Sequence, residues 1–281
     1  MERTVCGVLG DPISHSLSPV LHRAGYAALG LPWTYDAHRV PSGSLPQFLA
    51  GLDGTWRGLS LTMPLKREAV ALVADLSERA RRSGAVNTVV LDGHEGSPTL
   101  WGDNTDIPGA VAAIRERSAG VLRTATILGG GATATSVGLA LVEMGVEQIA
   151  LLVRTPERAR ETVEVLTAGS DAPAVDVRLL SDPVAPSDVV VSTVPASAQH
   201  DDLVRSLAES PVLFDVVYDP WPTPLAAAAT GVVVSGLDLL VHQAAVQFTH
   251  FTGQPAPLEA MRAAGESALA ARTEQSRGDQ P

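Results

Sequence analysis

A strand, a glycine-rich turn, a helix and a second strand follow one another in the middle of this chain. Residues 124–128 (TATIL) form a short apolar run, and residues 129–134 (GGGATA) interrupt it. A helical segment then extends to Met144, and residues 148–153 (QIALLV) form the next strand. Glycines at such a turn let backbone N–H groups and a helix N-terminus approach a pyrophosphate. The unit therefore predicts a doubly wound α/β domain that binds a dinucleotide.

The rest of the chain is expected to complete this domain and to form a second one. Apolar runs at 189–194, 212–217 and 232–234 are expected to add parallel strands to the same sheet. Two later helical segments, 238–252 and 257–271, are not followed by a strand-like run. They are therefore expected to pack on the first part of the chain. We predict a two-domain α/β fold with these parts: a substrate-binding domain at 1–105, a Rossmann-like domain at 106–238, C-terminal helices at 239–271 that pack on the first domain, and a disordered polar tail at 272–281.

Composition limits the class of protein. The 281 residues are 45% hydrophobic and 18% charged, which is ordinary for a soluble globular protein. The single cysteine, Cys6, cannot form an internal disulfide, so we expect a reducing, cytoplasmic compartment and a small apolar role for Cys6 in the first strand. The net charge of −11 argues against nucleic acid as a partner. We expect no signal peptide, no membrane span, no metal site, and a monomer or homodimer.

The end of the second dinucleotide-domain strand predicts which cofactor is bound. An Asp or Glu at this position usually holds the free ribose hydroxyl of NAD. Here the chain instead reads VRTPER at 153–158, where Arg154, Thr155 and Arg158 could clamp a phosphate. The alternative is a solvated helix start. We interpret the segment as a site for the 2′-phosphate of NADP.

Two ionisable residues occur in unusual surroundings ahead of the glycine turn. Lys66 closes the run SLTMPLK at 60–66, and Asp103 lies in GDNTD at 102–106. A buried Lys–Asp pair can exchange protons because each charge tunes the other, although an ordinary ion pair remains the alternative. Lys66 is expected to begin an amphipathic helix that extends to Arg82, since apolar residues recur there near the helical period.

The first loop contains three serines, Ser14, Ser16 and Ser18. Ser18 precedes Pro19 and is expected to be a helix N-cap. Ser14 and Ser16 have no evident structural role. Asn87 lies inside a predicted strand at 85–91.

Taken together, the chain resembles the shikimate dehydrogenase family nearly from end to end. No one matching segment is specific, but their order is. The segments are SHSLSP at 14–19, LTMPLK at 61–66, GAVNT at 84–88, GDNTD at 102–106, DVVYDP at 215–220 with TPL at 223–225, and LVHQAA at 240–245. The resemblance implies an oxidoreductase that reversibly reduces 3-dehydroshikimate to shikimate with NADP in aromatic amino-acid biosynthesis.

The resemblance also implies site residues. Ser14 and Ser16 would hold the substrate carboxylate. The ring hydroxyls and the reacting oxygen would be held by Thr62, Lys66, Asn87, Asp103 and Gln243. Tyr218 would lie near both ligands. Lys66 would be the catalytic proton donor, oriented and charged by Asp103. Gln247 shares a helix face with Gln243, so it could reach the same pocket.

The implied cofactor contacts come from the glycine turn, the phosphate clamp, the next strand end and the start of the C-terminal helices. They are Gly129, Gly130, Gly131, Ala132, Thr133, Arg154, Thr155, Arg158, Thr193, Pro195 and Gly236. The chain departs from the family at Val153 and Thr135, which could weaken NADP binding, and at Ile107. Asp238 stands close to the expected nicotinamide position, and we expect it to point away as a helix N-cap.

Three alternatives share these motifs. One is a quinate/shikimate dehydrogenase with broader specificity or NAD as cofactor, and the missing strand-end acid argues against NAD. A dehydrogenase for an amino-shikimate analogue is the second. The third, a non-catalytic ligand-sensing regulator, is disfavoured by the presence of both Lys66 and Asp103.

Overall fold

The computed structural model describes residues 4–92 and 99–278. It divides the chain into two compact units. Unit 1 comprises Met1–Thr105 and Leu240–Pro281, and unit 2 comprises Asp106–Leu239. Helix α10 (Gly236–Thr252) carries the chain from unit 2 back into unit 1.

Unit 1 is built on a six-stranded sheet with the order β2-β1-β3-β5-β6-β4 within the described residues. Its strands are β1 (Val5–Gly10), β2 (Thr34–Arg39), β3 (Trp56–Leu61), β4 (Asp75–Leu76), β5 (Thr88–Asp92) and β6 (Thr99–Asp103). Strand β5 runs antiparallel to both of its neighbours, β3 and β6, whereas the remaining pairs are parallel. The start of β5 therefore lies beside the ends of β3 and β6.

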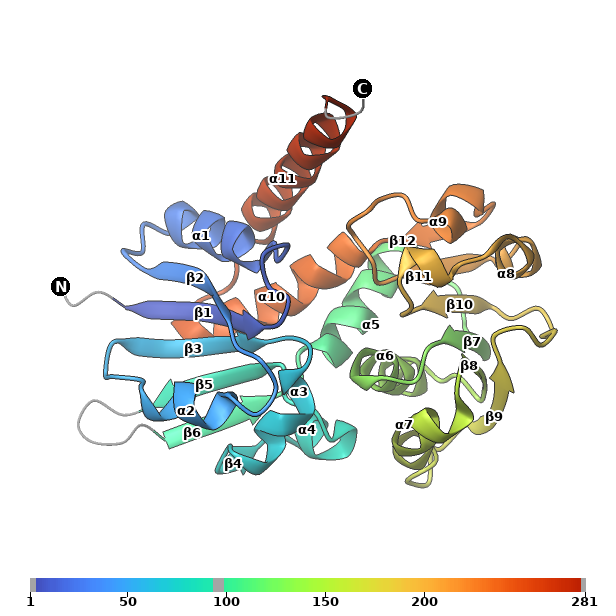
Figure 1. Ribbon diagram of the computed structural model, residues 1–281, viewed down its shortest axis with the longest axis horizontal. Helices are drawn as coiled ribbons and strands as arrows, with labels where there is room; N and C mark the ends of the chain where they lie inside the picture. The colour runs from blue at the N-terminus through green and yellow to red at the C-terminus, as the bar shows by residue number, and fades with distance from the viewer. Residues whose placement is uncertain (1–3, 93–98, 279–281) are drawn as a thin grey trace. The chain divides into compact units, whose positions relative to one another are not determined.

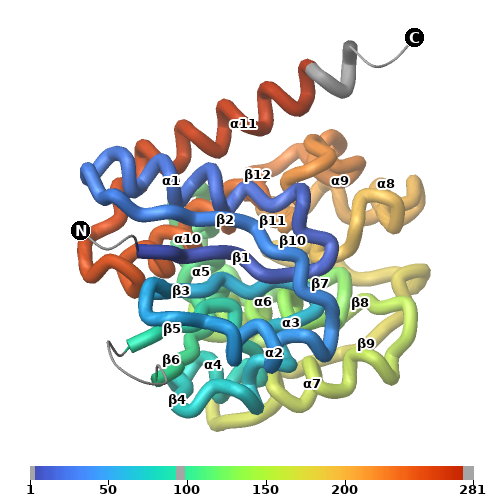
Figure 2. The backbone as a smooth tube through the Cα atoms, turned by 60° about the vertical axis from the view of Figure 1, so that its left-hand side comes forward, coloured from blue at the N-terminus to red at the C-terminus, as the bar shows by residue number. Residues whose placement is uncertain are grey.

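Helices cover both faces of this sheet (Figure 1). They are α1 (Ser18–Ala28), α2 (Leu45–Ala50), α3 (Leu65–Glu68), the 3₁₀ turn η1 (Ala69–Ala71), α4 (Glu78–Ser83) and α11 (Leu258–Gly278), together with α10. On one face, His22 from α1 stacks on Tyr35 and approaches Phe248 and Phe251 from α10. Helix α11 packs along α1, as Figures 1 and 2 both show. The opposite face buries an aliphatic cluster beneath α2, α3 and α4.

The segment 66–82 differs from its prediction as one amphipathic helix. It contains α3, η1, the short strand β4 and α4. Asp75 and Leu76 pair with β6, and the Ser77 hydroxyl then accepts a hydrogen bond from Ala80 N (3.0 Å) as the N-cap of α4. Strand pairing and a serine cap thus override the helical period, because both satisfy backbone groups that one continuous helix would have to satisfy internally.

Two helix boundaries also differ from prediction. Helix α1 begins at Ser18 with Leu17 in the capping position, so Ser18 is not the N-cap. Helix α11 extends to Gly278 instead of ending near residue 271, because no glycine or proline interrupts 266–277. The last three residues of the predicted tail lie outside the described residues.

Unit 2 contains a parallel six-stranded sheet with the order β12-β11-β10-β7-β8-β9 within the described residues. Its strands are β7 (Thr124–Leu128), β8 (Gln148–Val153), β9 (Ala174–Leu179), β10 (Val189–Ser192), β11 (Val212–Asp215) and β12 (Val232–Val234). Its helices are α5 (Asp106–Arg117), α6 (Ala132–Glu143), η2 (Pro156–Ala159), α7 (Arg160–Leu166), η3 (Ala196–Ala198), α8 (Asp201–Leu207) and α9 (Pro224–Ala228). The predicted two-domain α/β fold is confirmed, although β9 was not predicted.

The two faces of this sheet bury separate aliphatic clusters. Ile127 and Leu151 face the cluster that includes α5, α6 and α7. Their neighbours Leu128 and Leu152 face the cluster that includes α8 and α9. Successive strand residues point to opposite faces, so a strand covered on both sides reads as a continuous apolar run. This explains why the sequence revealed β7, β8 and β10.

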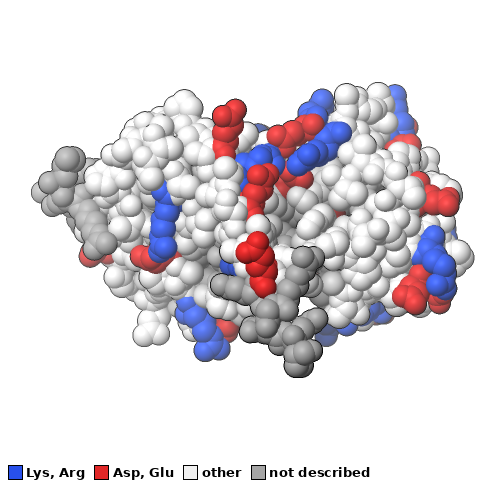
Figure 3. Space-filling view, turned by 90° about the horizontal axis from the view of Figure 1, so that it is seen from above, with Lys and Arg blue, Asp and Glu red and all other residues white. Residues whose placement is uncertain are grey.

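Surface and thiol properties agree with the composition. Cys6 is buried in β1, where burial raises the pKa of its thiol to about 12, so it has the small apolar role that was predicted. Acidic and basic side chains are interspersed over the face in Figure 3. In 4–92 and 99–278, no helix combines the length and hydropathy needed to cross a bilayer.

His22 is fully buried, and neither of its ring nitrogens has a hydrogen-bond partner within the described part of the chain. Burial lowers the pKa of the imidazole from 6.5 to about 3, because a charged ring would lose its hydration there. The unfolded chain takes up this proton at a higher pH than the folded protein. Stability from the neutral ring is therefore present above 6.5 and is lost as the pH falls from 6.5 toward 3.

We expect His22→Phe to remove this part of the acid sensitivity. On going from about pH 7.5 to about pH 5.5, His22 should cost the wild type roughly 1.4 kcal/mol of unfolding free energy. Urea unfolding at both pH values measures this loss. Other titrating groups are common to both proteins, so equal losses in wild type and variant would contradict the assignment.

Candidate functional site

In unit 1, the backbone of Asn87 joins three segments that are distant in sequence. Its carbonyl accepts from Leu61 N at the end of β3 (2.7 Å), and its N–H donates to Asp103 O at the end of β6 (3.1 Å). The antiparallel β5 makes this possible, since it begins where its two neighbours end. The predicted residues Thr62, Asn87 and Asp103 are thereby brought to one end of the sheet, where β3 and β6 finish and β5 starts.

The Asn87 side chain is buried and takes part in a hydrogen-bond network inside unit 1. Its Oδ1 accepts from Thr105 N (2.8 Å) and from the Thr88 hydroxyl (2.7 Å). Its Nδ2 lies 3.0 Å from Thr105 Oγ1 and 3.3 Å from Gln243 Oε1. The structure thus brings the predicted residues Asn87 and Gln243 together. Thr105, which was not predicted as a site residue, lies between them.

A second amide, Gln247, lies one helical turn after Gln243 but is buried and hydrogen-bonded below the Asn87 backbone. Its Nε2 donates to Asn87 O (3.2 Å) and Thr88 Oγ1 (2.9 Å). Its Oε1 accepts from the Ser60 hydroxyl (2.8 Å), which in turn accepts from the Tyr35 hydroxyl (2.5 Å). Gln247 therefore supports Asn87 from behind, and its reach into the substrate pocket stays a prediction.

Asp103 is buried at the end of β6, with hydrogen-bond donors from three residues. Oδ1 accepts from the Ser77 hydroxyl and from Asn104 N, and Oδ2 lies 3.0 Å from His250 Nε2. Burial alone would raise the pKa of this carboxyl. The hydrogen bonds from His250, Ser77 and Asn104 N outweigh burial, so the pKa is lowered from its ordinary value and Asp103 is ionised at neutral pH.

Lys66 lies in the short helix α3, half-buried, and its backbone carbonyl accepts from Val86 N (2.7 Å). The expected pairing of Lys66 with Asp103 stays a prediction, and the structure adds His250 and Ser77 as contacts of Asp103. His250 and Ser77 were missed because nothing in their local sequence indicates a contact with Asp103.

The serine loop precedes α1. The Ser16 hydroxyl accepts from Ser18 N (3.3 Å), so the start of the helix uses Ser16 where Ser18 was expected. Ser14 is exposed and Ser16 is half-buried. Thr62, after β3, is half-buried, and its N–H donates to Leu9 O (2.9 Å) at the end of β1. The substrate contacts implied for these three residues stay predictions.

In unit 2, the glycine turn lies between the end of β7 and the start of α6. Gly129 has a φ of +106°, a left-handed conformation that favours glycine, and a Cβ there would collide with Thr193 Oγ1. Gly131 is the extended residue before α6, and Ala132 and Thr133 form the first turn of that helix. The first N–H groups of a helix have no partner within it, so they are available to a phosphate.

Threonines hold this turn in place. Thr193 Oγ1 donates to Leu128 O (2.7 Å), and Thr162 Oγ1 donates to Gly130 O (2.9 Å). Thr135 is buried, with its hydroxyl 2.7 Å from that of Thr162. Thr135 therefore supports the turn from inside, and a basic side chain in its place would be buried. The neighbour order β8-β7-β10 puts the turn at the point where the sheet reverses its winding, which is where such folds bind dinucleotides.

A hollow of about 410 Å³ lies beyond the carboxyl ends of β8, β9 and β10. Predicted residues Arg154 and Pro195 line it, together with Ser181, Ser197 and His200, which were not predicted. Arg154, Thr155 and Arg158 are all exposed, and Arg158 N donates to Thr155 O (3.1 Å) in the turn that begins η2. Val153 is buried in the core, so its difference from the family pattern does not remove an exposed polar group.

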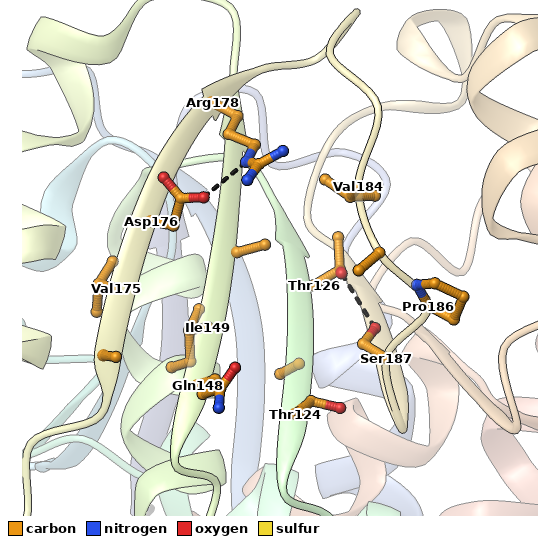
Figure 4. Close-up of a pocket in the computed structure, with 14 residues that line it drawn as sticks. Thr124, Thr126, Gln148, Ile149, Val175, Asp176, Arg178, Val184, Pro186 and Ser187 are labelled. Carbon is orange, nitrogen blue, oxygen red and sulfur yellow. Dashed lines mark hydrogen bonds and ion pairs between the residues drawn. The ribbon is translucent and has the colours of Figure 1, made fainter.

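A second hollow of about 260 Å³ lies on the open part of the sheet face (Figure 4). Thr124, Gln148 and Asp176 are among its lining residues, and Ser187 hydrogen-bonds Thr126 across it (3.0 Å). It exists because the connection from β9 to β10 contains no helix. It lies away from the carboxyl ends of the strands, so it is not the dinucleotide site.

The junction before α10 explains Gly236 and Asp238. A Cβ on Gly236 would collide with the carbonyl of Val216, so only glycine permits this close approach. Asp238 Oδ2 accepts from Ser235 N (2.9 Å) and from the Ser235 hydroxyl (2.8 Å), while Ser235 Oγ accepts from Asp238 N (3.2 Å). Asp238 is thus not the N-cap that was predicted. It is the third helical residue in a capping box, with Ser235 as the cap.

Asp238 is also buried against Arg117, with 2.8 Å between Oδ1 and Nη2. Both carboxylate oxygens are therefore engaged within unit 2, and the acid is not available to a nicotinamide. Tyr218, half-buried after β11, is placed in the same unit, and its role toward the ligands stays a prediction.

Comparisons with known proteins match this architecture. A family model described as the shikimate dehydrogenase substrate binding domain matches residues 8–89. Another, the shikimate 5'-dehydrogenase C-terminal domain, matches residues 236–264. Shikimate dehydrogenase (NADP(+)) of Desulfitobacterium hafniense is 34% identical over 271 residues, covering 94% of this chain and 97% of that protein. The chain belongs to the shikimate dehydrogenase family.

Solved structures of family members resemble the whole chain. Mycobacterium tuberculosis shikimate dehydrogenase has a TM-score of 0.84 at 40% identity, covering 94% of this chain and 99% of that one. Quinate dehydrogenase from Corynebacterium glutamicum in complex with NAD has a TM-score of 0.85 at 28% identity, with the same coverage of both chains. Similar structures of this fold thus include one named for quinate and solved with NAD.

The capping box predicts how Asp238→Ala should behave. Losing the cap partner and the ion pair with Arg117 should lower the unfolding free energy by roughly 1–2 kcal/mol. The KM for the dinucleotide should stay unchanged, because the carboxylate faces Ser235 and Arg117. Urea unfolding and initial rates measure the two effects.

Asp202→Ala is the matched control, since this acid is exposed in α8 and its ion pair with Arg205 lies at the surface. It should change neither stability nor KM appreciably. A raised KM for Asp238→Ala without a loss of stability would instead place the acid near the nicotinamide.

Proposed function

We propose that this protein is an NADP-dependent shikimate dehydrogenase that interconverts 3-dehydroshikimate and shikimate in aromatic amino-acid biosynthesis. The observation that carries the proposal is the group formed by the ionised, buried Asp103 and the Asn87–Gln243 amides, in a chain of this family. A polyol acid matches this group, because amides and a carboxylate recognise hydroxyls and reject analogues that leave them unpaired.

The residues of unit 1 would handle the substrate and its proton. Ser14 and Ser16 would donate hydroxyl hydrogen bonds to the carboxylate, and Thr62, Asn87 and Gln243 would orient the ring. Lys66 would donate a proton from Nζ to the oxygen of the reacting carbonyl and stabilise the charge that develops there. Asp103 would accept a hydrogen bond from a ring hydroxyl and would orient and charge Lys66.

The residues of unit 2 would bind the dinucleotide. The N–H groups after Gly131 would hold the pyrophosphate, Arg154, Thr155 and Arg158 the 2′-phosphate, and the hollow beside Arg154 the adenosine. Thr193 and Gly236 would border the nicotinamide. When bound, NADPH supplies the hydride that reduces the ketone.

The direct test is an initial-rate assay of the purified protein. Shikimate or quinate is combined with NADP or NAD, and the absorbance of the reduced nicotinamide is followed. We expect the highest kcat/KM with shikimate and NADP. No turnover with this combination would refute the proposal, and faster turnover of quinate with NAD would favour the activity named for the Corynebacterium relative.

Lys66→Ala tests the proton donor. We expect kcat to fall about 10²-fold or more, because a positioned general acid contributes on that order. NADP affinity, measured by fluorescence titration, should stay near the wild-type value. Arg67→Ala is the control, as it removes a neighbouring exposed cation. Turnover of Lys66→Ala close to wild type would exclude Lys66 as the proton donor.

The double variant Arg154→Ala/Arg158→Ala tests the phosphate clamp. Losing charge-assisted hydrogen bonds of about 1.5 kcal/mol or more each should raise the KM for NADP at least tenfold. The KM for NAD, which lacks the phosphate, should change little. Arg160→Ala, an exposed cation at the start of α7, is the control. Equal losses for NADP and NAD would mean that the arginines do not recognise the 2′-phosphate.

We also propose a cytoplasmic enzyme, because the buried Cys6 thiol needs no oxidising compartment. A monomer or a homodimer remains our prediction for its assembly.

A further inference from the structure

We infer that His250 is a positioning residue for Asp103: through its Nε2 contact it holds the carboxylate in the orientation that the reaction uses. This inference rests on the proposed function. The two residues are 147 positions apart in sequence, and 3.0 Å separates His250 Nε2 from Asp103 Oδ2. The contact joins α10 to the end of β6 inside unit 1.

Both oxygens of the Asp103 carboxylate have hydrogen-bond partners. Oδ1 accepts from the Ser77 hydroxyl at the cap of α4 and from Asn104 N, the next residue of the chain. Oδ2 lies within hydrogen-bond distance of His250 Nε2, so different groups hold the two oxygens. The torsion about the bond to Cβ has a broad intrinsic minimum, so hydrogen bonds set it, and donors on both oxygens hold it more firmly than donors on Oδ1 alone. His250 provides the contact that restrains this rotation.

His250 is itself held in place. Its ring meets Trp101, two residues before Asp103 on β6, edge to face, with centroids 5.1 Å apart and planes at 72°. The ring therefore has an aromatic contact that sets its plane and a carboxylate contact that sets its direction. Its side chain remains 29% exposed, whereas that of Asp103 is 2% exposed. The histidine is thus partly accessible to solvent, whereas the carboxylate that it contacts is buried.

The expected consequence is a loss of turnover without a loss of cofactor affinity. His250→Leu removes the Nε2 donor and should lower kcat for shikimate oxidation about tenfold, the effect of one charge-assisted hydrogen bond. The KM for NADP should not change, because the dinucleotide residues belong to unit 2. His250→Gln places an amide donor where Nε2 lies and should recover most of the lost turnover.

A double-mutant cycle separates positioning from general damage. In the Asp103→Asn background, His250→Leu should have little further effect on kcat, because the group that it positions has already been changed. The control is Thr249→Leu, which puts the same side chain one position earlier on α10, where the native residue is exposed. It should leave kcat near wild type.

The outcomes are distinct. If the wild type oxidises shikimate and His250→Leu has the same kcat, the inference is overturned and the proposed function stands. Equal losses in both backgrounds, or no recovery by His250→Gln, also overturn it. If the wild type does not oxidise shikimate, the proposed function fails. Urea unfolding of the wild type, His250→Leu, Asp103→Asn and the double variant then still tests the contact. Additive changes in unfolding free energy would then contradict it, and non-additive changes would support it.

Discussion

The candidate substrate site depends on one strand running against its neighbours. Because β5 is antiparallel to β3 and β6, Asn87 at its start can accept a backbone hydrogen bond from Leu61 and donate one to Asp103. A parallel strand would place its start at the opposite end of the sheet, far from both residues. This pairing brings the ends of β3 and β6 to the start of β5, and α10 then adds Gln243, Gln247 and His250.

Polar groups can be buried at this end of the sheet only because they form hydrogen bonds with one another. Burying an amide or hydroxyl without a partner costs on the order of 1–3 kcal/mol. Asn87, Thr88, Ser60 and Gln247 avoid this cost through a shared network that spans two strands and a helix. Such a network is rigid, since moving one member breaks the bonds of several others. The same physics makes the unpartnered His22 a point of acid sensitivity.

The sequence predicted some elements better than others for identifiable reasons. Strands such as β7 and β8 are covered on both faces and appear as apolar runs, whereas β9 alternates Val175 and Val177 with charged residues at the sheet edge and was missed. The 66–82 segment has a helical period, but β4 pairs with β6 there, and a propensity cannot anticipate a distant partner. Asp238 was recognised near a helix start, but its capping partner Ser235 was not.

The sequence by itself determined the fold class, the order of the two domains and the identity of most candidate residues, because periodicity and motif order are local properties of the chain. Only the tertiary structure decided which groups meet. It paired Asp103 with His250 and Ser77, placed Gln247 behind Asn87, and turned Thr135 inward. These outcomes depend on strand direction and helix placement, which set distances between residues that no local pattern connects.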